Sequence, residues 1–119
     1  MTIAARQAWA FRRQAAFLEI EVRSRESALA AARAFRELQE NDAEPFPCLL
    51  MLDNMTPQEM TGVLGALWSE NLLEYILTEA SGRIAESNLE TYSACGVDAI
   101  SMGALTHSSR ALDLCQRLQ

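Results

Sequence analysis

The chain has 119 residues, of which 50% are hydrophobic, and its formal net charge is -6 at pH 7. This length suits one compact core, or part of one, rather than two. The acidic balance argues against nucleic acid and membrane surfaces as partners, because a basic face usually meets both. All 10 basic residues are arginines. Schiff-base chemistry and a lysine-based phosphate clamp are therefore excluded within this chain.

The cysteines are widely spaced, odd in number and without a Cys-x-x-Cys pair: Cys48, Cys95 and Cys115. We interpret them as small buried residues in a reducing compartment and expect a cytoplasmic protein. No apolar run approaches the roughly 20 residues of a membrane span, and no signal-type block follows the first arginines. An organelle such as a plastid stays open as the location of a longer protein with an upstream transit segment.

The first part of the chain predicts helix, strand and helix in turn. Residues 1–15 have the apolar spacing of a helix. In residues 16–22, apolar side chains alternate with Glu19 and Glu21, which is the period of a strand with two different faces. The alanine-rich residues 25–40 again have helical spacing and lead into a polar segment with two prolines.

The middle of the chain continues with a strand that ends sharply. Residues 48–52 are an unbroken apolar run that stops at Asp53, which predicts a strand buried on both faces, as parallel strands often are. A helix start with a hydroxyl N-cap, a first-turn proline and a carboxylate follows at Thr56, Pro57 and Glu59. Residues 73–80 then predict a third strand.

The last part repeats this alternation. Ser87 and Glu90 have the spacing of a second capping box, which predicts a short helix that stops at Gly96. Residues 97–102 predict a fourth strand, and residues 111–118 predict a closing helix.

Four strands, each followed by a helix, indicate an α/β fold with a parallel sheet. Units of roughly 20 to 30 residues match half of a (β/α)₈ barrel, for which about 250 residues are typical. We therefore predict about four parallel strands with interleaved helices, arranged as half of a barrel.

In such folds the ligand site lies at the carboxyl ends of the strands. The residues found there are two carboxylates and two glycine-bearing turns: Glu21, Asp53, Ser81-Gly82 and Met102-Gly103-Ala104. Carboxylates at this position can hold Mg²⁺, which also binds substrate phosphates. Glycine-bearing turns let backbone N–H groups approach a phosphate.

Each of these residues also has an ordinary structural interpretation. Asp53, with Asn54 beside it, is more often a turn or helix cap than a metal ligand. Glu19 and Glu21 are equally well explained as solvated side chains on an exposed strand face. The turns at Ser81-Gly82 and Gly103 are of a kind that is ordinary between strand and helix in most proteins, and His107 is more often a surface or capping residue than a catalyst. Position alone therefore leaves the function open.

The motifs taken together, in their order and spacing, are more specific. They are Glu19-Ile20-Glu21-Val22, Met51-Leu52-Asp53-Asn54-Met55-Thr56-Pro57, Glu79-Ala80-Ser81-Gly82, Gly96-Val97-Asp98-Ala99-Ile100-Ser101-Met102-Gly103-Ala104-Leu105-Thr106-His107 and Ala111-Leu112-Asp113-Leu114. This series resembles the quinolinate phosphoribosyltransferases, the carboxylating nicotinate-nucleotide pyrophosphorylases. The resemblance runs from roughly Ala4 to the end of the chain.

The resemblance implies a glycosyltransferase that converts quinolinate and phosphoribosyl pyrophosphate to nicotinate mononucleotide, pyrophosphate and carbon dioxide in NAD biosynthesis. It implies Mg²⁺ as cofactor and a homo-oligomer for the full enzyme. By resemblance, Glu21 and Asp53 bind the metal and the ribose end of phosphoribosyl pyrophosphate. The ribose phosphate is then expected between Ser81-Gly82 and Met102-Gly103-Ala104.

Two departures from the family pattern concern loops. Glu21 and Asp53 are 32 positions apart, more than is usual, and the excess falls in residues 39–47. We interpret it as a surface-loop insertion that leaves the strand ends undisturbed. Arg83 stands where many members have another glycine, which bears on phosphate geometry rather than on the fold.

A third departure concerns activity. The family holds the two quinolinate carboxylates with arginines, lysines and a histidine upstream of this stretch and completes each site with a partner subunit's residue. We therefore expect residues 1–119 to be the C-terminal part of the barrel domain, without the N-terminal domain and the first barrel strands, and to be inactive alone. The alternative is a non-catalytic phosphate-binding or interaction domain derived from the same fold.

Overall fold

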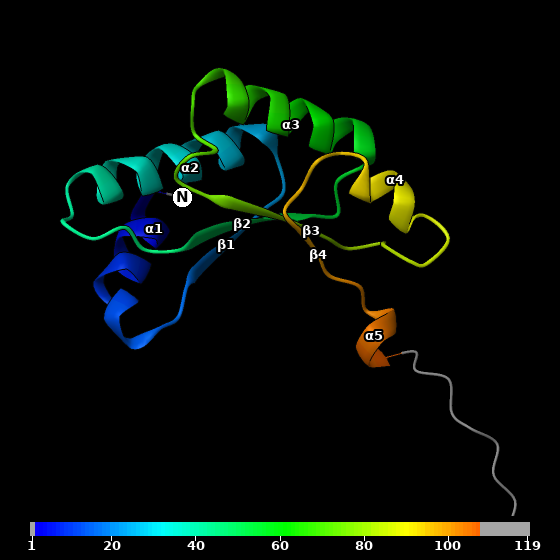
Figure 1. The fold of residues 1–119 in the computed structure, drawn as a ribbon, viewed down its shortest axis with the longest axis horizontal. Coiled ribbons are helices and arrows are strands. Elements are labelled where there is room, and N and C mark those ends of the chain that lie inside the picture. Colours follow the sequence, from blue (N-terminus) through cyan, green and yellow to red (C-terminus); the bar gives the residue numbers. More distant parts are fainter. Residues whose placement is uncertain (1, 108–119) are drawn as a thin grey trace, which may run out of the picture.

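The computed structural model describes residues 2–107; Cys115 and the helix predicted at 111–118 lie outside them. Helices and strands alternate along the chain (Figure 1), as predicted for an α/β fold. The elements are α1 (Thr2–Ala10), the 3₁₀ helix η1 (Arg12–Gln14), β1 (Leu18–Val22), α2 (Arg25–Glu40), β2 (Cys48–Asp53), α3 (Pro57–Ser69), β3 (Leu77–Ser81), α4 (Leu89–Ser93), β4 (Ala99–Ile100) and α5 (Ala104–His107).

The four strands form one parallel sheet in the order β1-β2-β3-β4. Sequential parallel order requires each helix to cross back over the sheet, which is the connection that the strand–helix repeat predicts. The sheet edges are β1 and β4, and these are the two edges of the predicted half-barrel.

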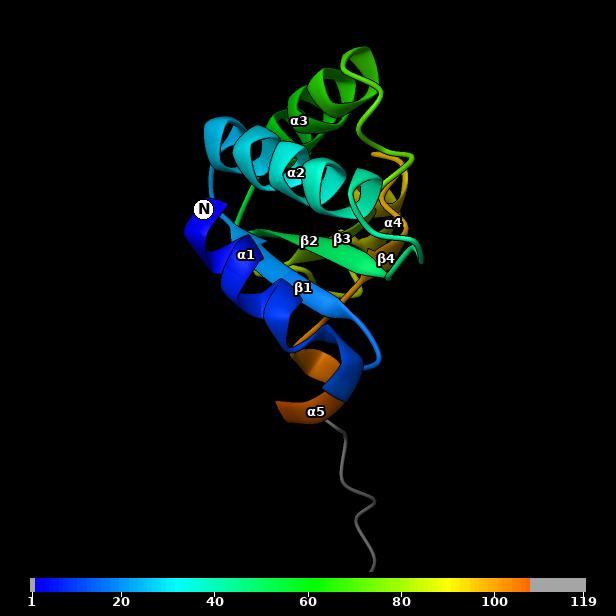
Figure 2. The ribbon, with the colours of Figure 1, turned by 90° about the vertical axis from the view of Figure 1, so that its left-hand side faces the viewer.

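Helices α2 and α3 cover one face of the sheet, and the opposite side chains of the strands are partly or fully exposed. Helices α2 and α3 lie together over the sheet, and α1 packs against α2 and β1 (Figure 2). Burial of apolar side chains such as Phe35 and Leu50, both fully buried, stabilises the fold by about 1.5–3 kcal/mol each. The sheet side chains under this layer are Leu18, Ile20, Val22, Cys48, Leu50, Leu52, Thr78 and Ala80.

The prediction that residues 48–52 are buried on both faces is wrong. Cys48, Leu50 and Leu52 are buried, but Leu49 and Met51 between them are partly exposed. The reason is that no element among residues 2–107 covers the second face of the sheet. An apolar strand with one open face is the pattern of a barrel strand whose inner side has yet to be enclosed.

The start of α3 follows the prediction. Thr56 is the N-cap, and its hydroxyl oxygen accepts a hydrogen bond from the backbone N–H of Glu59 at 3.3 Å. The Glu59 carboxylate accepts the backbone N–H of Thr56 at 2.7 Å in return. This capping box pairs backbone donors at the helix end and directs α3 away from the end of β2.

The third strand is shorter than predicted, because residues 73–76 form a turn rather than a strand. Asn71 adopts a positive φ of 54°, and Tyr75 donates its N–H to Leu72 at 3.1 Å. Leu72 and Ile76 are buried in this turn. They are apolar because they cover the end of the core after α3. From the sequence pattern alone, such a buried turn cannot be distinguished from a strand.

The second capping box is also wrong. Asn88, rather than Ser87, is the N-cap of α4, and its side chain makes no cap hydrogen bond. It instead accepts the N–H of Ala85 at 2.8 Å and donates to the Arg83 carbonyl at 3.0 Å, which holds the loop before the helix. The helix ends close to Gly96, whose φ of 89° agrees with the predicted stop.

The fourth strand is limited to Ala99–Ile100, although residues 97–102 were predicted. Backbone hydrogen bonds extend its pairing slightly, from Asp98 N–H to the Thr78 carbonyl and from Ser101 N–H to the Ala80 carbonyl, both 3.0 Å. The Asp98 carboxylate also accepts the buried Thr78 hydroxyl at 2.8 Å. The Asp98 side chain thus fixes this edge to β3.

The loop insertion packs against the N-terminal helices. Phe46 lies edge-on to Trp9, with ring centroids 6.3 Å apart, and Arg12 stacks over the same indole ring and pairs with Asp42. The loop leads into the first residue of β2. These contacts therefore lie toward the amino ends of the strands, away from the carboxyl ends. None of the helices within residues 2–107 is long and apolar enough to cross a membrane.

Candidate functional site

The carboxyl ends of the strands bring the predicted carboxylates and the first glycine turn to one edge of the sheet. Asp53 and Ser81 are register partners in β2 and β3, and Glu21 lies one strand further, opposite Met51. Strand alternation directs Glu21, Asp53 and Ser81 to the face that the helices leave open. The edge therefore carries charged and polar groups where each strand leaves the sheet.

A single guanidinium joins the two carboxylates. Arg23 follows β1, and its NH2 group lies 2.7 Å from Glu21 Oε1. Its Nε donates to Asp53 Oδ2 at 3.0 Å. The side chain of Asp53 is only 12% exposed, whereas those of Glu21 and Arg23 are 50% and 73% exposed. The bridge thus has one fixed member, Asp53, and two solvent-facing members.

The environment of Asp53 favours its ionised form. Its neighbour Asn54 donates from Nδ2 to Asp53 Oδ2 at 2.9 Å. This hydrogen bond, followed by the Arg23 charge, lowers the pKa of the Asp53 carboxyl below its ordinary value. The helix-cap interpretation of Asp53 does not hold, because Thr56 caps α3.

Asn54 also connects this cluster to the glycine turn after β3. It adopts a φ of 56°, and its backbone N–H donates to the Ser81 carbonyl at 2.9 Å. Gly82 has a φ of 81°, and a Cβ atom there would lie 2.8 Å from Asn54 Cγ. Only glycine fits this close approach. Arg83 continues the turn with a φ of 58°, a conformation that glycine adopts more readily than arginine.

An open cavity of about 460 Å³ lies beside this turn. Ser81 and Gly82 from one strand end and Met102 and Gly103 from the next line it, as expected from the sequence, whereas Ala104 begins α5 and is not part of the lining. The complete lining is Ser81, Gly82, Arg83, Ile84, Ser101, Met102, Gly103 and Thr106.

Ser101 is a lining residue that the sequence interpretation missed. Its Oγ is buried and has no hydrogen-bond partner, the sole such side-chain atom found within residues 2–107. A buried hydroxyl without a partner usually indicates a ligand or water that completes it. The sequence did hold one signal for Ser101. It lies one residue before the predicted Met102-Gly103 turn, in a strand-like segment, and so at a strand end where site residues are expected.

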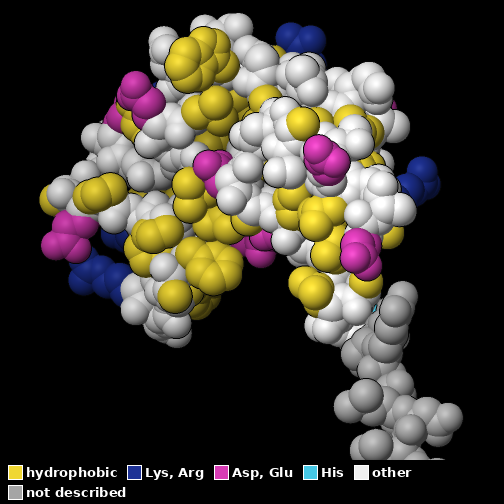
Figure 3. Space-filling model, turned by 45° about the vertical axis from the view of Figure 1, so that its right-hand side comes forward, with side chains coloured by type: hydrophobic (Ala, Val, Ile, Leu, Met, Phe, Trp, Pro, Cys, Tyr) yellow, Lys and Arg dark blue, Asp and Glu magenta, His cyan; other side chains and the backbone are white. Residues whose placement is uncertain are grey.

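The open face of the sheet behind this edge is acidic and apolar. Glu19 and Glu79 lie on it with Leu49, Met51 and the 49% exposed Leu77. Partial burial, together with the nearby Glu79, raises the pKa of the Glu19 carboxyl. Figure 3 shows hydrophobic and acidic side chains exposed close together on the hollowed underside of the molecule.

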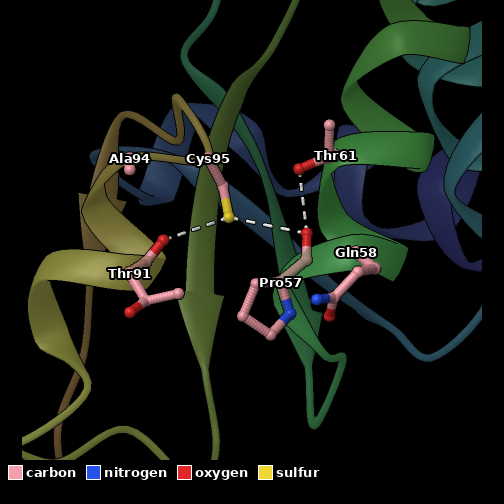
Figure 4. Close-up of a pocket in the computed structure, with 6 residues that line it drawn as sticks. All are labelled: Pro57, Gln58, Thr61, Thr91, Ala94 and Cys95. Carbon is pink, nitrogen blue, oxygen red and sulfur yellow. Dashed lines mark hydrogen bonds between the residues drawn. The ribbon is translucent and has the colours of Figure 1, made fainter.

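A second hollow, between α3 and α4, contains none of the predicted site residues (Figure 4). The Cys95 thiol points into it and lies 3.5 Å from the Pro57 carbonyl and 3.4 Å from the Thr91 carbonyl, while Thr61 donates to Pro57 at 2.9 Å. Its lining has no charged side chain. The strand-end edge is therefore the better candidate for anionic substrates.

Comparisons with known proteins identify the family. Residues 1–116 match the family model described as quinolinate phosphoribosyl transferase, C-terminal domain. A protein of Methanothermobacter thermautotrophicus named "probable nicotinate-nucleotide pyrophosphorylase (carboxylating)" is 35% identical over 97 residues, which are 82% of this chain and 31% of that protein. The nicotinate-nucleotide pyrophosphorylase (carboxylating) of Rattus norvegicus is 32% identical over 85% of this chain and 29% of its own length.

Solved structures show the same fold. A NadC deletion mutant aligns with a TM-score of 0.72 and 27% identity, over 94% of this chain and 34% of that one. NadC from Streptococcus pyogenes aligns with a TM-score of 0.71 and 26% identity, over 95% and 34%. The C-terminal domain of NadC is a (β/α) barrel, as expected. The chain thus spans about a third of the relatives that it matches, and it belongs to the quinolinate phosphoribosyl transferase C-terminal domain family.

Proposed function

We propose that this chain carries the part of a quinolinate phosphoribosyltransferase site that binds Mg²⁺ and phosphoribosyl pyrophosphate. The complete reaction would join quinolinate to the phosphoribosyl group and release pyrophosphate and carbon dioxide, yielding nicotinate mononucleotide for NAD biosynthesis. Family membership and the names of the relatives support the reaction. The observation that carries the assignment of the half-site is the meeting of Glu21, Asp53 and the glycine-lined cavity at one sheet edge.

The residues at this edge fit a Mg²⁺ ion. Asp53 is held ionised by its neighbours, and Glu21 supplies a second carboxylate at the next strand end. No group of three or more His, Cys, Asp or Glu side chains that could hold a metal occurs in the described part of the chain. Two carboxylates suit Mg²⁺, which commonly takes one or two and completes its shell with water and substrate phosphates. When bound, Mg²⁺ would neutralise charge on the departing pyrophosphate.

The cavity after β3 and β4 suits the phosphate of the ribose. Ser81 and Thr106 bring hydroxyls to its lining, Arg83 brings a positive charge, and the Gly82 and Gly103 turns bring backbone groups without a Cβ. The unpaired Ser101 hydroxyl adds a further donor. Charge-assisted hydrogen bonds of this kind orient a phosphate relative to the carboxylates of Asp53 and Glu21, which lie one and two strands from β3.

Quinolinate binding requires groups beyond these. Its two carboxylates demand fixed cations, yet the chain has no lysine, and within residues 2–107 the arginines nearest the strand ends are Arg23 and Arg83. We therefore propose that other segments of a complete barrel, and a second subunit of a cytoplasmic homo-oligomer, supply the quinolinate pocket. The open acidic face of the sheet is suited to meet such cationic side chains.

The test compares three carboxylate variants of one strand edge. Glu21→Ala and Asp53→Ala should weaken Mg²⁺-dependent binding of phosphoribosyl pyrophosphate to the chain, measured by calorimetry. In a full-length enzyme carrying this segment they should lower turnover about a hundredfold, the effect of removing one group from a pre-organised charge cluster.

Glu19→Ala is the matched control. It removes a carboxylate from the same strand and the same face, two residues earlier, where the neighbour is Glu79 rather than the bridge. Equal and small effects of all three substitutions would refute the assignment.

A further inference from the structure

The Arg23 guanidinium lies between the carboxylates of Glu21 and Asp53. Its guanidinium contacts one oxygen of each carboxylate, at 2.7 Å and 3.0 Å. Glu21 is the last but one residue of β1 and Arg23 the first residue after it, and the side chains of both lie toward Asp53. The two negative charges at this edge are thus already partly compensated by a residue of the chain itself.

The ion pairs of Arg23 with Glu21 and Asp53 can break at little cost. The Arg23 side chain is 73% exposed, and ion pairs at this exposure contribute little net stability. Arg23 also lines an open hollow of about 350 Å³, which reaches Glu59 at the start of α3. The side chain therefore has space, and another carboxylate on the same hollow, when it leaves Asp53.

We propose that Arg23 is an exchangeable counter-ion: it closes the Glu21–Asp53 pair when no metal is bound and is displaced when Mg²⁺ binds. The inference rests on the proposed function, because it takes the pair to be the Mg²⁺ site. Its consequence is that Mg²⁺ alone binds weakly. An incoming phosphate-bearing ligand, which supplies oxygens to Mg²⁺ and an anion for the released guanidinium, shifts the balance toward the metal-bound state.

The first measurement is the affinity of the full 119-residue chain for Mg²⁺ alone, by calorimetry. Arg23→Ala should bind Mg²⁺ about three- to tenfold more tightly than the wild type, since a competing positive charge has been removed. Arg23→Lys keeps the charge and should restore most of the wild-type affinity. The gain in Arg23→Ala should disappear when Asp53→Asn is added.

Arg25→Ala is the matched charge control. This substitution changes the net charge by the same amount as Arg23→Ala. The Arg25 side chain lines the same hollow, but its charge acts on Glu70 rather than on the pair. Its Mg²⁺ affinity should equal that of the wild type. An equal gain in Arg25→Ala would show a general charge effect and overturn the counter-ion role.

The second measurement follows the Arg23 Nε–H resonance of the wild-type chain by NMR, assigned from its loss in Arg23→Lys. Mg²⁺ should shift this resonance and speed its exchange with water as the hydrogen bond to Asp53 breaks. If Mg²⁺ binds and Asp53→Asn weakens that binding, yet Arg23→Ala leaves it unchanged, the counter-ion role alone fails. If no variant binds Mg²⁺, with or without phosphoribosyl pyrophosphate, the proposed metal site and the counter-ion role fail together.

Discussion

At the scale of single residues, the close approach of Gly82 to Asn54 joins the carboxylate edge to the turn that lines the cavity after β3. Gly82→Ala would place a Cβ 2.8 Å from Asn54 Cγ at a φ of 81°, so we expect it to lower the free energy of unfolding by about 1–3 kcal/mol. Chemical denaturation measures this change. The Gly82→Ala substitution should also weaken binding of phosphoribosyl pyrophosphate, because it displaces Asn54, which orients Asp53.

Gly62→Ala provides the control for this prediction. Gly62 is exposed in the interior of α3, and a Cβ there would meet nothing within 4 Å. The substitution should raise the free energy of unfolding by about 0.5–1 kcal/mol through helix propensity. A Gly82→Ala variant as stable as Gly62→Ala would show that the turn is not constrained as described.

The candidate site shows what single residues reveal without a structure. Glu21, Asp53 and the two glycine turns follow apolar strands, and the parallel-sheet rule places strand ends together, so these could be predicted. The Arg23 bridge could not, because it depends on a side chain reaching from one strand to the next. Ser101 was missed for a similar reason: an unpaired hydroxyl is visible only after every neighbour is placed.

At the scale of elements, the capping box of α3 directs the chain away from the site immediately after Asp53. Thr56→Ala removes the hydroxyl that accepts the Glu59 N–H and should lower the free energy of unfolding by about 1 kcal/mol. Thermal or urea denaturation measures the loss. Thr61→Ala, which removes an exposed hydroxyl bonded to the Pro57 carbonyl within the same helix, should change stability little. Similar losses in both variants would contradict the capping role.

The elements also show where sequence patterns fail. The capping box at Thr56 is recognisable because both partners are local, and the alternating strand at residues 16–22 because its period is strict. The turn at residues 73–76 was mistaken for a strand, because buried apolar residues that close a core have no period of their own. Ser87 was mistaken for the N-cap of α4. The N-cap is Asn88, whose side chain bonds to the backbone of the preceding loop at Ala85.

At the scale of the whole molecule, the sheet has two edge strands and one uncovered face. Leu77 on that face and Trp68 on α3 are 49% and 74% exposed. Edges with apolar flanks invite pairing with other chains. We expect the purified chain to self-associate or aggregate in size-exclusion chromatography with light scattering. A stable, well-behaved monomer at micromolar concentration would count against the half-barrel interpretation.

We propose that this chain holds one half of a phosphoribosyltransferase site, and an activity assay of the chain alone is the measurement that decides it. Proximity of quinolinate to the phosphoribosyl group requires cations on both of its carboxylates. The arginines within the described residues 2–107 do not gather at the strand ends. The half-site assignment predicts Mg²⁺-dependent binding of phosphoribosyl pyrophosphate without quinolinate-dependent formation of nicotinate mononucleotide. Turnover by the chain alone, with no other polypeptide added, would contradict it.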